Sequence, residues 1–168
     1  MIAADYCAMM ARYNMWQNNQ LMDILDVVEE VELTKNHGAF FGSIFSTLNH
    51  LMWGDMFWMS NFGQGSGPTC SGKDSVILHP NYAAWRAERI KLDAQIVQWA
   101  ENLTDEDLKG DVTWPSFSLG RDVSKPTGPC VAGFFNHQTH HRGQVHAMLT
   151  ASDLKAPVTD LVFMPGLQ

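Results

Sequence analysis

The segment from residue 40 to residue 62 constrains the fold most, because its side chains are apolar on nearly every side of a helix. Its few polar residues include His50 and Asp55. A helix of this kind is stable only when other elements cover it on several sides. The polar interruptions also argue against a bilayer-spanning helix. We therefore expect a central, buried helix and no membrane span.

Three further segments have the apolar spacing of amphipathic helices: residues 4–31, 82–103 and 130–152. In the segment 82–103 the charged residues, Arg89 among them, predict one solvated face. Residues 63–80 are rich in glycine and proline and predict a long connection. We therefore predict one all-α domain over residues 1–168, a four-helix bundle with a long crossover connection.

The helical period disappears between residues 104 and 129. The apolar stretches Val112-Thr113-Trp114 and Phe117-Ser118-Leu119 predict a short hairpin there, turning around Pro115.

Charge and cysteine content narrow the function classes. The chain has 11 basic and 18 acidic residues and a net charge of −7, so it lacks the phosphate attraction of nucleic-acid-binding proteins. The three cysteines, Cys7, Cys70 and Cys130, form no CxxC pair and suggest no disulfide framework. The N-terminal residues do not resemble a secretory signal. We expect a cytoplasmic protein that binds neither nucleic acid nor membrane.

Two histidines of the last predicted helix, His137 and His141, are four residues apart and therefore lie on one face. The same stripe continues through apolar residues, so both imidazoles should point into the protein. His50 on the buried helix is the expected third ligand. Three imidazoles and an open position suit one divalent transition-metal ion, zinc or nickel first, with cobalt and iron also compatible.

Spacing alone leaves a second interpretation open, in which these histidines are ordinary hydrogen-bonded core residues. His140 and His146 lie off the stripe and are interpreted as supporting or interface residues, while His37 and His79 receive no role. A zincin protease is disfavoured, because Gln138 occupies the position of the glutamate base. Residues 67–74 approach a P-loop, but Asp74 replaces the magnesium-binding Ser or Thr.

The run from Phe134 to His146 resembles the signature of the DinB (damage-inducible) family. Residues 13–18, the Leu48-Asn49-His50 motif with Asp55 and Trp58, and Asp160-Leu161 are similar to other motifs of that family. The resemblance covers nearly the whole chain. It implies a four-helix bundle with a metal site at His50, His137 and His141. Asp55, Arg142 and Asp160 match polar motif positions and are expected to order the site or the tail, although Arg142 also suits a surface ion pair.

Two functions compete. The first is a metal-dependent enzyme of the thiol S-transferase or hydrolase type, acting on an unknown small molecule, with a low-molecular-weight thiol as one candidate from the resemblance. Its catalytic residues beyond the ligands are unknown. The second is a non-catalytic stress-response protein whose ion clamps two helices. We also expect a homodimer, with Trp58, Phe62 and Trp99 as candidates for its surface or for the core.

Overall fold

The computed structural model describes residues 2–116 and 119–167 and is mostly helical, with one small sheet. Its long helices are α1 (Ala4–Leu25), α3 (Ile44–Asn61), α4 (Tyr82–Glu101) and α5 (Thr127–Ala151). The shorter elements are the helix α2 (Glu30–Thr34), the 3-10 helices η1 (Gly72–Ile77) and η2 (Leu161–Phe163), and the antiparallel strands β1 (Asp111–Ser116) and β2 (Arg121–Pro126).

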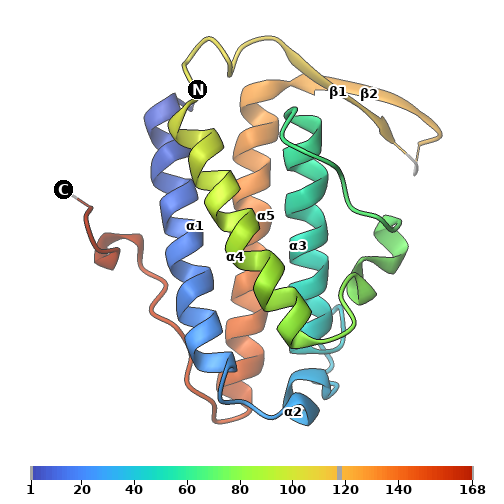
Figure 1. The fold of residues 1–168 in the computed structure, drawn as a ribbon, viewed down its shortest axis with the longest axis vertical. Coiled ribbons are helices and arrows are strands. Elements are labelled where there is room, and N and C mark those ends of the chain that lie inside the picture. The colour runs from blue at the N-terminus through green and yellow to red at the C-terminus, as the bar shows by residue number, and fades with distance from the viewer. Residues whose placement is uncertain (1, 117–118, 168) are drawn as a thin grey trace.

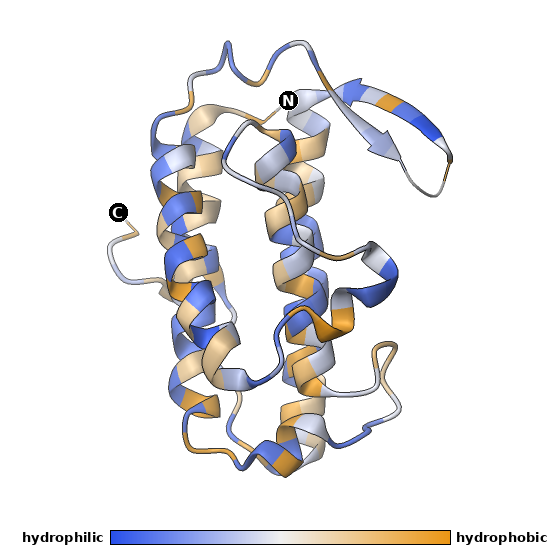
Figure 2. Ribbon diagram, turned by 45° about the vertical axis from the view of Figure 1, so that its right-hand side comes forward, coloured by the Kyte–Doolittle hydropathy of each residue, from blue (hydrophilic) through white to orange (hydrophobic). Residues whose placement is uncertain are grey.

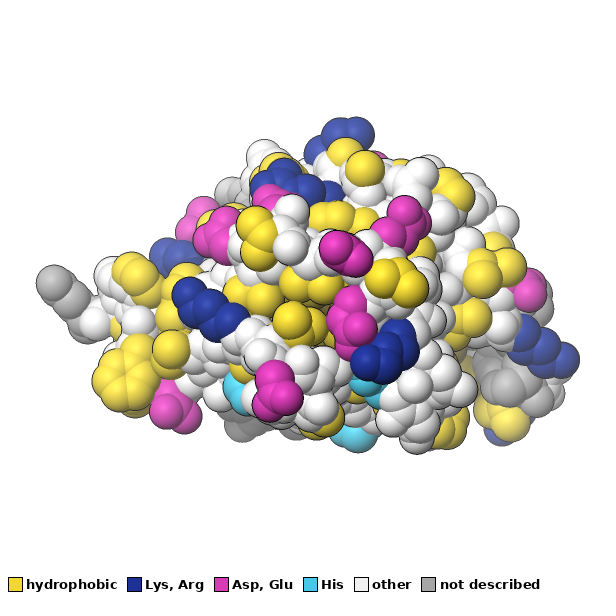
Figure 3. Space-filling model, turned by 90° about the horizontal axis from the view of Figure 1, so that it is seen from below, with side chains coloured by type: hydrophobic (Ala, Val, Ile, Leu, Met, Phe, Trp, Pro, Cys, Tyr) yellow, Lys and Arg dark blue, Asp and Glu magenta, His cyan; other side chains and the backbone are white. Residues whose placement is uncertain are grey.

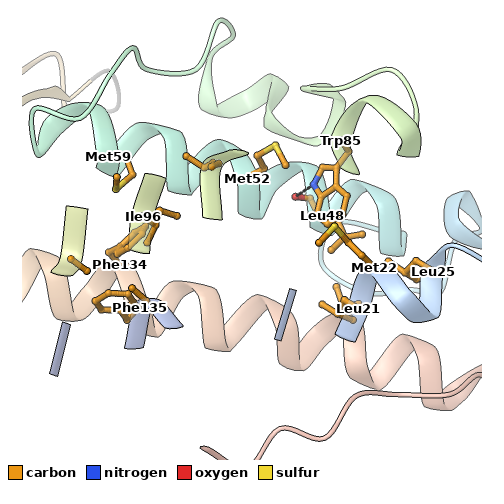
Figure 4. Packing of buried hydrophobic residues seen from close by; sticks show 14 of the residues in the cluster. Leu21, Met22, Leu25, Leu48, Met52, Met59, Trp85, Ile96, Phe134 and Phe135 are labelled. Carbon is orange, nitrogen blue, oxygen red and sulfur yellow. Dashed lines mark hydrogen bonds between the residues drawn. The ribbon is translucent and has the colours of Figure 1, made fainter. Parts of the chain in front are cut away.

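The long helices lie side by side, and the hairpin of β1 and β2 extends from one end (Figure 1). α1 packs chiefly against α4, and α3 packs chiefly against α5. Between them the buried side chains form one core, in which Trp85 donates from Nε1 to the Leu48 carbonyl at 3.1 Å (Figure 4). The helices carry polar and apolar residues in alternating bands, as expected of helices with one buried face (Figure 2). Among the described helices, none combines the length and apolarity needed to cross a bilayer.

The first helix ends at Leu25, earlier than the predicted residue 31. The Asp26 carboxylate accepts hydrogen bonds from Arg86 and from the Tyr82 hydroxyl, which fixes the chain at the point where it leaves α1. A turn and α2 follow, and Leu33 is buried there. The apolar residues that extended the predicted helix lie in this turn and in α2, where Val28 packs against the core and Val31 is 69% exposed.

The buried helix α3 begins at Ile44, four residues later than predicted. The Ser43 side chain accepts a hydrogen bond from the Ser46 backbone N–H and caps the helix. Before it, Gly42 has φ +81° and pairs with Ala39, so residues 39–42 form a turn. This turn brings Phe41 over the face of α3 that carries His50.

The hairpin is present, but its turn is not at Pro115. Val112, Thr113 and Trp114 belong to β1, as predicted, and Pro115 lies within the same strand, opposite Asp122. A two-stranded sheet has only edge strands, which tolerate proline. The second strand is Arg121–Pro126 and not residues 117–119, of which Phe117 and Ser118 lie outside the described residues. α5 then starts at Thr127, three residues before Cys130, since a proline such as Pro129 is tolerated in a first turn.

Arg89 does not belong to a solvated face of α4, contrary to the prediction. Its side chain is 0% exposed and lies 2.6 Å from Asp55 of α3 and 2.8 Å from Asp93. The next residue of the helix, Ile90, is apolar but 47% exposed. The apolar face of α4 is therefore interrupted by a buried ion pair that crosses to α3.

The end of the molecule near α2 exposes apolar side chains. Val27, Val31 and Phe40 are each more than two-thirds exposed. Viewed from this end, the surface shows apolar groups interspersed with acidic and basic ones (Figure 3).

Candidate metal centre

His50, His137 and His141 form a cluster between α3 and α5. One ring nitrogen of each lies within 4.8 Å of those of the other two. The Nε2 atoms of His50 and His137 are 3.2 Å apart, and the His141 ring centroid is 4.8 Å from that of His50 and 4.4 Å from that of His137. The structure therefore brings together the three residues that the sequence singled out.

Hydrogen bonds to the outer ring nitrogens orient two of these imidazoles. The Nδ1 atom of His141 lies 2.8 Å from Gln144 Oε1, and that oxygen can only accept, so Nδ1 carries the proton and Nε2 keeps its lone pair. The Nδ1 atom of His50 lies 2.9 Å from the hydroxyl of Ser75, which is buried. A partner at Nδ1 that leaves Nε2 free is the arrangement found around metal-binding histidines.

Asn49, the residue before His50, binds the long crossover that carries Ser75. The Asn49 side-chain nitrogen donates to the carbonyls of Val76 and His79, and its oxygen accepts from the His79 backbone N–H. Asn49 is fully buried. Two consecutive residues of α3 therefore bind the crossover: Asn49 contacts the crossover backbone, and His50 contacts the Ser75 side chain.

His137 and His50 are also confined by close neighbours. A Cβ atom added at Gly54 would lie 2.6 Å from Cε1 of His137, closer than real contacts allow, so α3 needs a glycine opposite this imidazole. The Phe41 ring lies 4.1 Å from the His50 ring and 5.4 Å from the His141 ring, centroid to centroid. Phe41 therefore shields one side of the cluster.

All three imidazoles are held in the neutral form. Burial, followed by repulsion from His137 and His141, lowers the pKa of His50 from 6.5 to about 4. Burial and repulsion from His141 lower the pKa of His137 to about 4, although the Asp55 carboxylate opposes the shift. Burial also lowers the pKa of His141, and the hydrogen bond that its Nδ1 donates to Gln144 opposes this shift. Neutral imidazole is the form that binds metal ions.

These donors fit a divalent transition-metal ion. Two nitrogens bound to one tetrahedral zinc ion lie roughly 3.3 Å apart, because each Zn–N bond is about 2.0–2.1 Å long. The 3.2 Å between the Nε2 atoms of His50 and His137 is close to that separation.

Nδ1 of His137 is buried without a hydrogen-bond partner in the described protein. Within residues 2–116 and 119–167 the cluster contains no fourth His, Cys, Asp or Glu.

The other histidines surround this centre or lie elsewhere. His140 is exposed and accepts a hydrogen bond from Gln144, which also contacts His141. His37 and His79, which received no role from the sequence, are half-buried. Nε2 of His79 lies 3.0 Å from the Met52 sulfur, and burial lowers the pKa of His79.

The polar motif residues have separate positions. Asp55 is fully buried and accepts from Gln138 of α5 at 2.8 Å as well as from Arg89. Gln138 is therefore a structural residue between α3 and α5. Arg142 is buried and donates to Asn14, so it is not a surface ion-pair residue. Asp160 is exposed and precedes η2.

The three aromatic residues considered for a dimer contact, Trp58, Phe62 and Trp99, pack largely against one another. The ring of Phe62 stacks on those of Trp58 and Trp99, with centroids 5.6 and 5.1 Å away. Trp58 also contacts Trp114 of β1, which anchors the hairpin on α3.

Sequence reasoning missed the residues that hold the ligands: Ser75, Gln144, Gly54 and Phe41. Gln144 could have been found, because it lies three residues after His141 on one helix face. The other three are brought in by chain folding, and nothing in their local sequence marks them.

Three surface cavities, of about 730, 720 and 440 Å³, are lined by residues other than the three histidines. His50 and His137 nevertheless keep partial exposure, while His141 is 7% exposed. Solvent therefore reaches His50 and His137, and none of these three cavities opens onto the cluster.

Comparison with known proteins gives two findings. A family model, that of the DinB family, matches residues 1–166. The crystal structure of a DinB-like protein from Bacillus cereus ATCC 10987 is similar in fold, with a TM-score of 0.54 and 20% sequence identity over 85% of this chain and 90% of that chain. No curated protein matches the chain.

Proposed function

This chain belongs to the DinB family, and from that premise we propose that it binds one divalent transition-metal ion, zinc or nickel, through His50, His137 and His141. We further propose that it is a metal-dependent enzyme of the hydrolase or thiol S-transferase type. We also assign its long helices to a four-helix bundle in which the crossover between α3 and α4 supports the site.

The incomplete ligand set carries this proposal. Three imidazoles converge without a fourth ligand among the described residues of the cluster, and two of them are partly exposed. A structural zinc site is closed by four protein ligands, whereas a catalytic site keeps one position open. A bound divalent ion lowers the pKa of a water or thiol that it holds. Burial keeps the imidazoles neutral, and contacts with Ser75, Gln144 and Gly54 orient them.

A non-catalytic role is the alternative, and one observation favours it. The cavities described above do not reach the histidines, and Phe41 covers one side of the cluster. In that case the ion would mainly clamp α3 to α5.

Metal analysis of protein purified without added ion tests the binding step. We expect one equivalent in the wild type, a sharp loss in His50→Ala, His137→Ala and His141→Ala, and retention in His140→Ala. Full occupancy of His50→Ala would remove α3 from the site.

A screen of low-molecular-weight thiols with electrophilic acceptors, and of hydrolysable esters and amides, tests the catalytic step. Turnover that disappears on chelation and returns with added ion would support the enzyme. Stoichiometric metal without turnover in either screen would favour the structural role.

We also propose that the protein forms a homodimer. Trp58 and Phe62 remain partly exposed after stacking and are the candidate contacts, whereas Trp99 is 8% exposed. A monomer mass by light scattering at micromolar concentration would count against this proposal.

A further inference from the structure

A cavity of about 440 Å³ lies on the other side of α5, between that helix, α1 and the tail that follows α5. Its walls include Arg142 and His146 of α5, Tyr13 of α1 and Thr159 of the tail. His146 is nine residues beyond His137, which places it about 180° round the helix. The cavity is therefore separate from the histidine cluster that faces α3.

Arg142 brings a poorly compensated positive charge to this cavity. The side chain is buried, its guanidinium donates to the neutral amide of Asn14, and it lies 5.6 Å from the centroid of the Tyr13 ring. Among the described residues, Arg142 takes part in none of the ion pairs within 4.0 Å.

The contrast with Arg89 is direct. Arg89 is also buried but touches two carboxylates, Asp55 and Asp93. A buried guanidinium without a contacting anion is costly, and such groups are normally paired. Arg142 therefore has the capacity for one more, negatively charged, partner.

The imidazole of His146 lines the same cavity. Nδ1 of His146 is buried and has no hydrogen-bond partner among the described residues. The hydroxyl protons of Tyr13 and Thr139 are already used, because Tyr13 donates to the Thr159 carbonyl at 2.6 Å and Thr139 donates to the Phe135 carbonyl at 3.2 Å. Arg142 and His146 are the basic side chains that line the cavity.

We propose that this cavity binds a small anionic group, a carboxylate or a phosphate, through Arg142 with His146 as the second contact. A planar guanidinium matches the paired oxygens of either group. The Thr159 carbonyl, held by Tyr13, closes the cavity on the tail side. The site depends on neither the ion nor the activity proposed above.

Titration calorimetry of the full chain with inorganic phosphate, and separately with acetate, tests the proposal at an ionic strength fixed with sodium chloride. We expect saturable binding of at least one anion with one site per chain. Thr139→Glu places a carboxylate one turn before Arg142 on the exposed cavity wall and should weaken binding roughly tenfold or more. Thr139→Gln has the same size without the charge and should bind like the wild type.

The His137→Ala variant shows whether the anion instead binds at the histidine cluster, and we expect it to retain binding. Thr139 is exposed, so these variants test the cavity without removing the buried Arg142. The proposal would be overturned by no saturable binding of either anion, by equal binding of Thr139→Glu and the wild type, or by loss of binding in His137→Ala. Equal loss in Thr139→Gln and Thr139→Glu would also overturn it, because charge would then not be the cause.

Discussion

At the scale of single residues, the candidate centre depends on side chains that contact the imidazoles. Gly54 leaves the space that the His137 ring occupies, and Ser75 and Gln144 bind the outer nitrogens of His50 and His141. These contacts fix where the inner nitrogens point. A small change in any of them should alter metal affinity before it alters the fold.

Replacing Gly54 with alanine should displace the His137 ring, since the new Cβ would lie 2.6 Å from its Cε1 atom. We expect metal affinity to fall by roughly tenfold or more, the effect typical of losing an outer contact. The matched control is Gly143→Ala in α5, where an added Cβ meets nothing within 4 Å. That control should keep its affinity and gain about 0.5–1 kcal/mol of stability. Competition with a coloured chelator measures the affinities, and unchanged binding by Gly54→Ala would mean that His137 is not a ligand.

Ser75→Ala should lower metal affinity by about 10- to 100-fold, because His50 loses the hydroxyl that orients Nδ1. The same chelator competition applies. Ser71 lies on the same crossover but contacts Asp74, so Ser71→Ala should bind metal normally. Equal affinities of the two variants would exclude the Ser75 contact as a determinant.

The sequence predicted the three converging histidines because two share a helix face and the third lies on the most apolar helix. Ser75 could not be predicted in the same way. It lies 25 positions after His50, in a glycine-rich connection whose path depends on Asn49. A periodic pattern predicts which residues share a helix face, but an irregular loop has no such pattern from which its contacts could be predicted.

At the scale of elements, buried polar contacts join α3 to two other helices. Asp55 accepts hydrogen bonds from Arg89 of α4 and Gln138 of α5 and is fully buried. It directly follows Gly54, so it holds α3 and α5 together beside His137. This explains why the helical pattern of α4 failed at Arg89: periodicity treats every arginine as solvated, whereas this one has two buried carboxylate partners.

Asp55→Ala should destabilise the protein by roughly 3–5 kcal/mol, because it leaves a buried guanidinium and amide without this partner. Asp26→Ala is the control, since Asp26 also pairs with an arginine of α4 but at the surface, and it should cost about 0–1 kcal/mol. Urea unfolding followed by circular dichroism gives both values. A similar loss in both variants would show that burial of the Asp55 pair adds nothing.

At the scale of the whole molecule, stability should depend on pH through the histidine cluster. The folded pKa values of His50 and His137 are lowered to about 4, from an ordinary value of 6.5. The unfolded chain therefore binds more protons between these values, and stability present above about pH 6.5 is lost as the pH falls toward 4. A bound ion adds to this loss, because protons compete with it for the same nitrogens.

Melting curves of metal-loaded and metal-free protein between pH 7 and about pH 5 test this expectation, a window that brackets the ordinary imidazole pKa. The loaded form should start at the higher melting temperature and lose more of it on acidification. A His50→Ala, His137→Ala double variant should show a flatter dependence than either. Parallel curves for the loaded and metal-free forms would mean that the ion adds nothing to the stability of the fold.

His137 and His141 lie one turn apart in α5, whereas His50 is 87 positions from His137 along the chain. Denaturation therefore removes His50 from the cluster but leaves the other two close in sequence. An ion retained by this pair would favour a turn of helix in the denatured ensemble, and refolding of the loaded chain would start from that turn. Because such an ion binds both states, it stabilises the native protein by less than its native affinity implies.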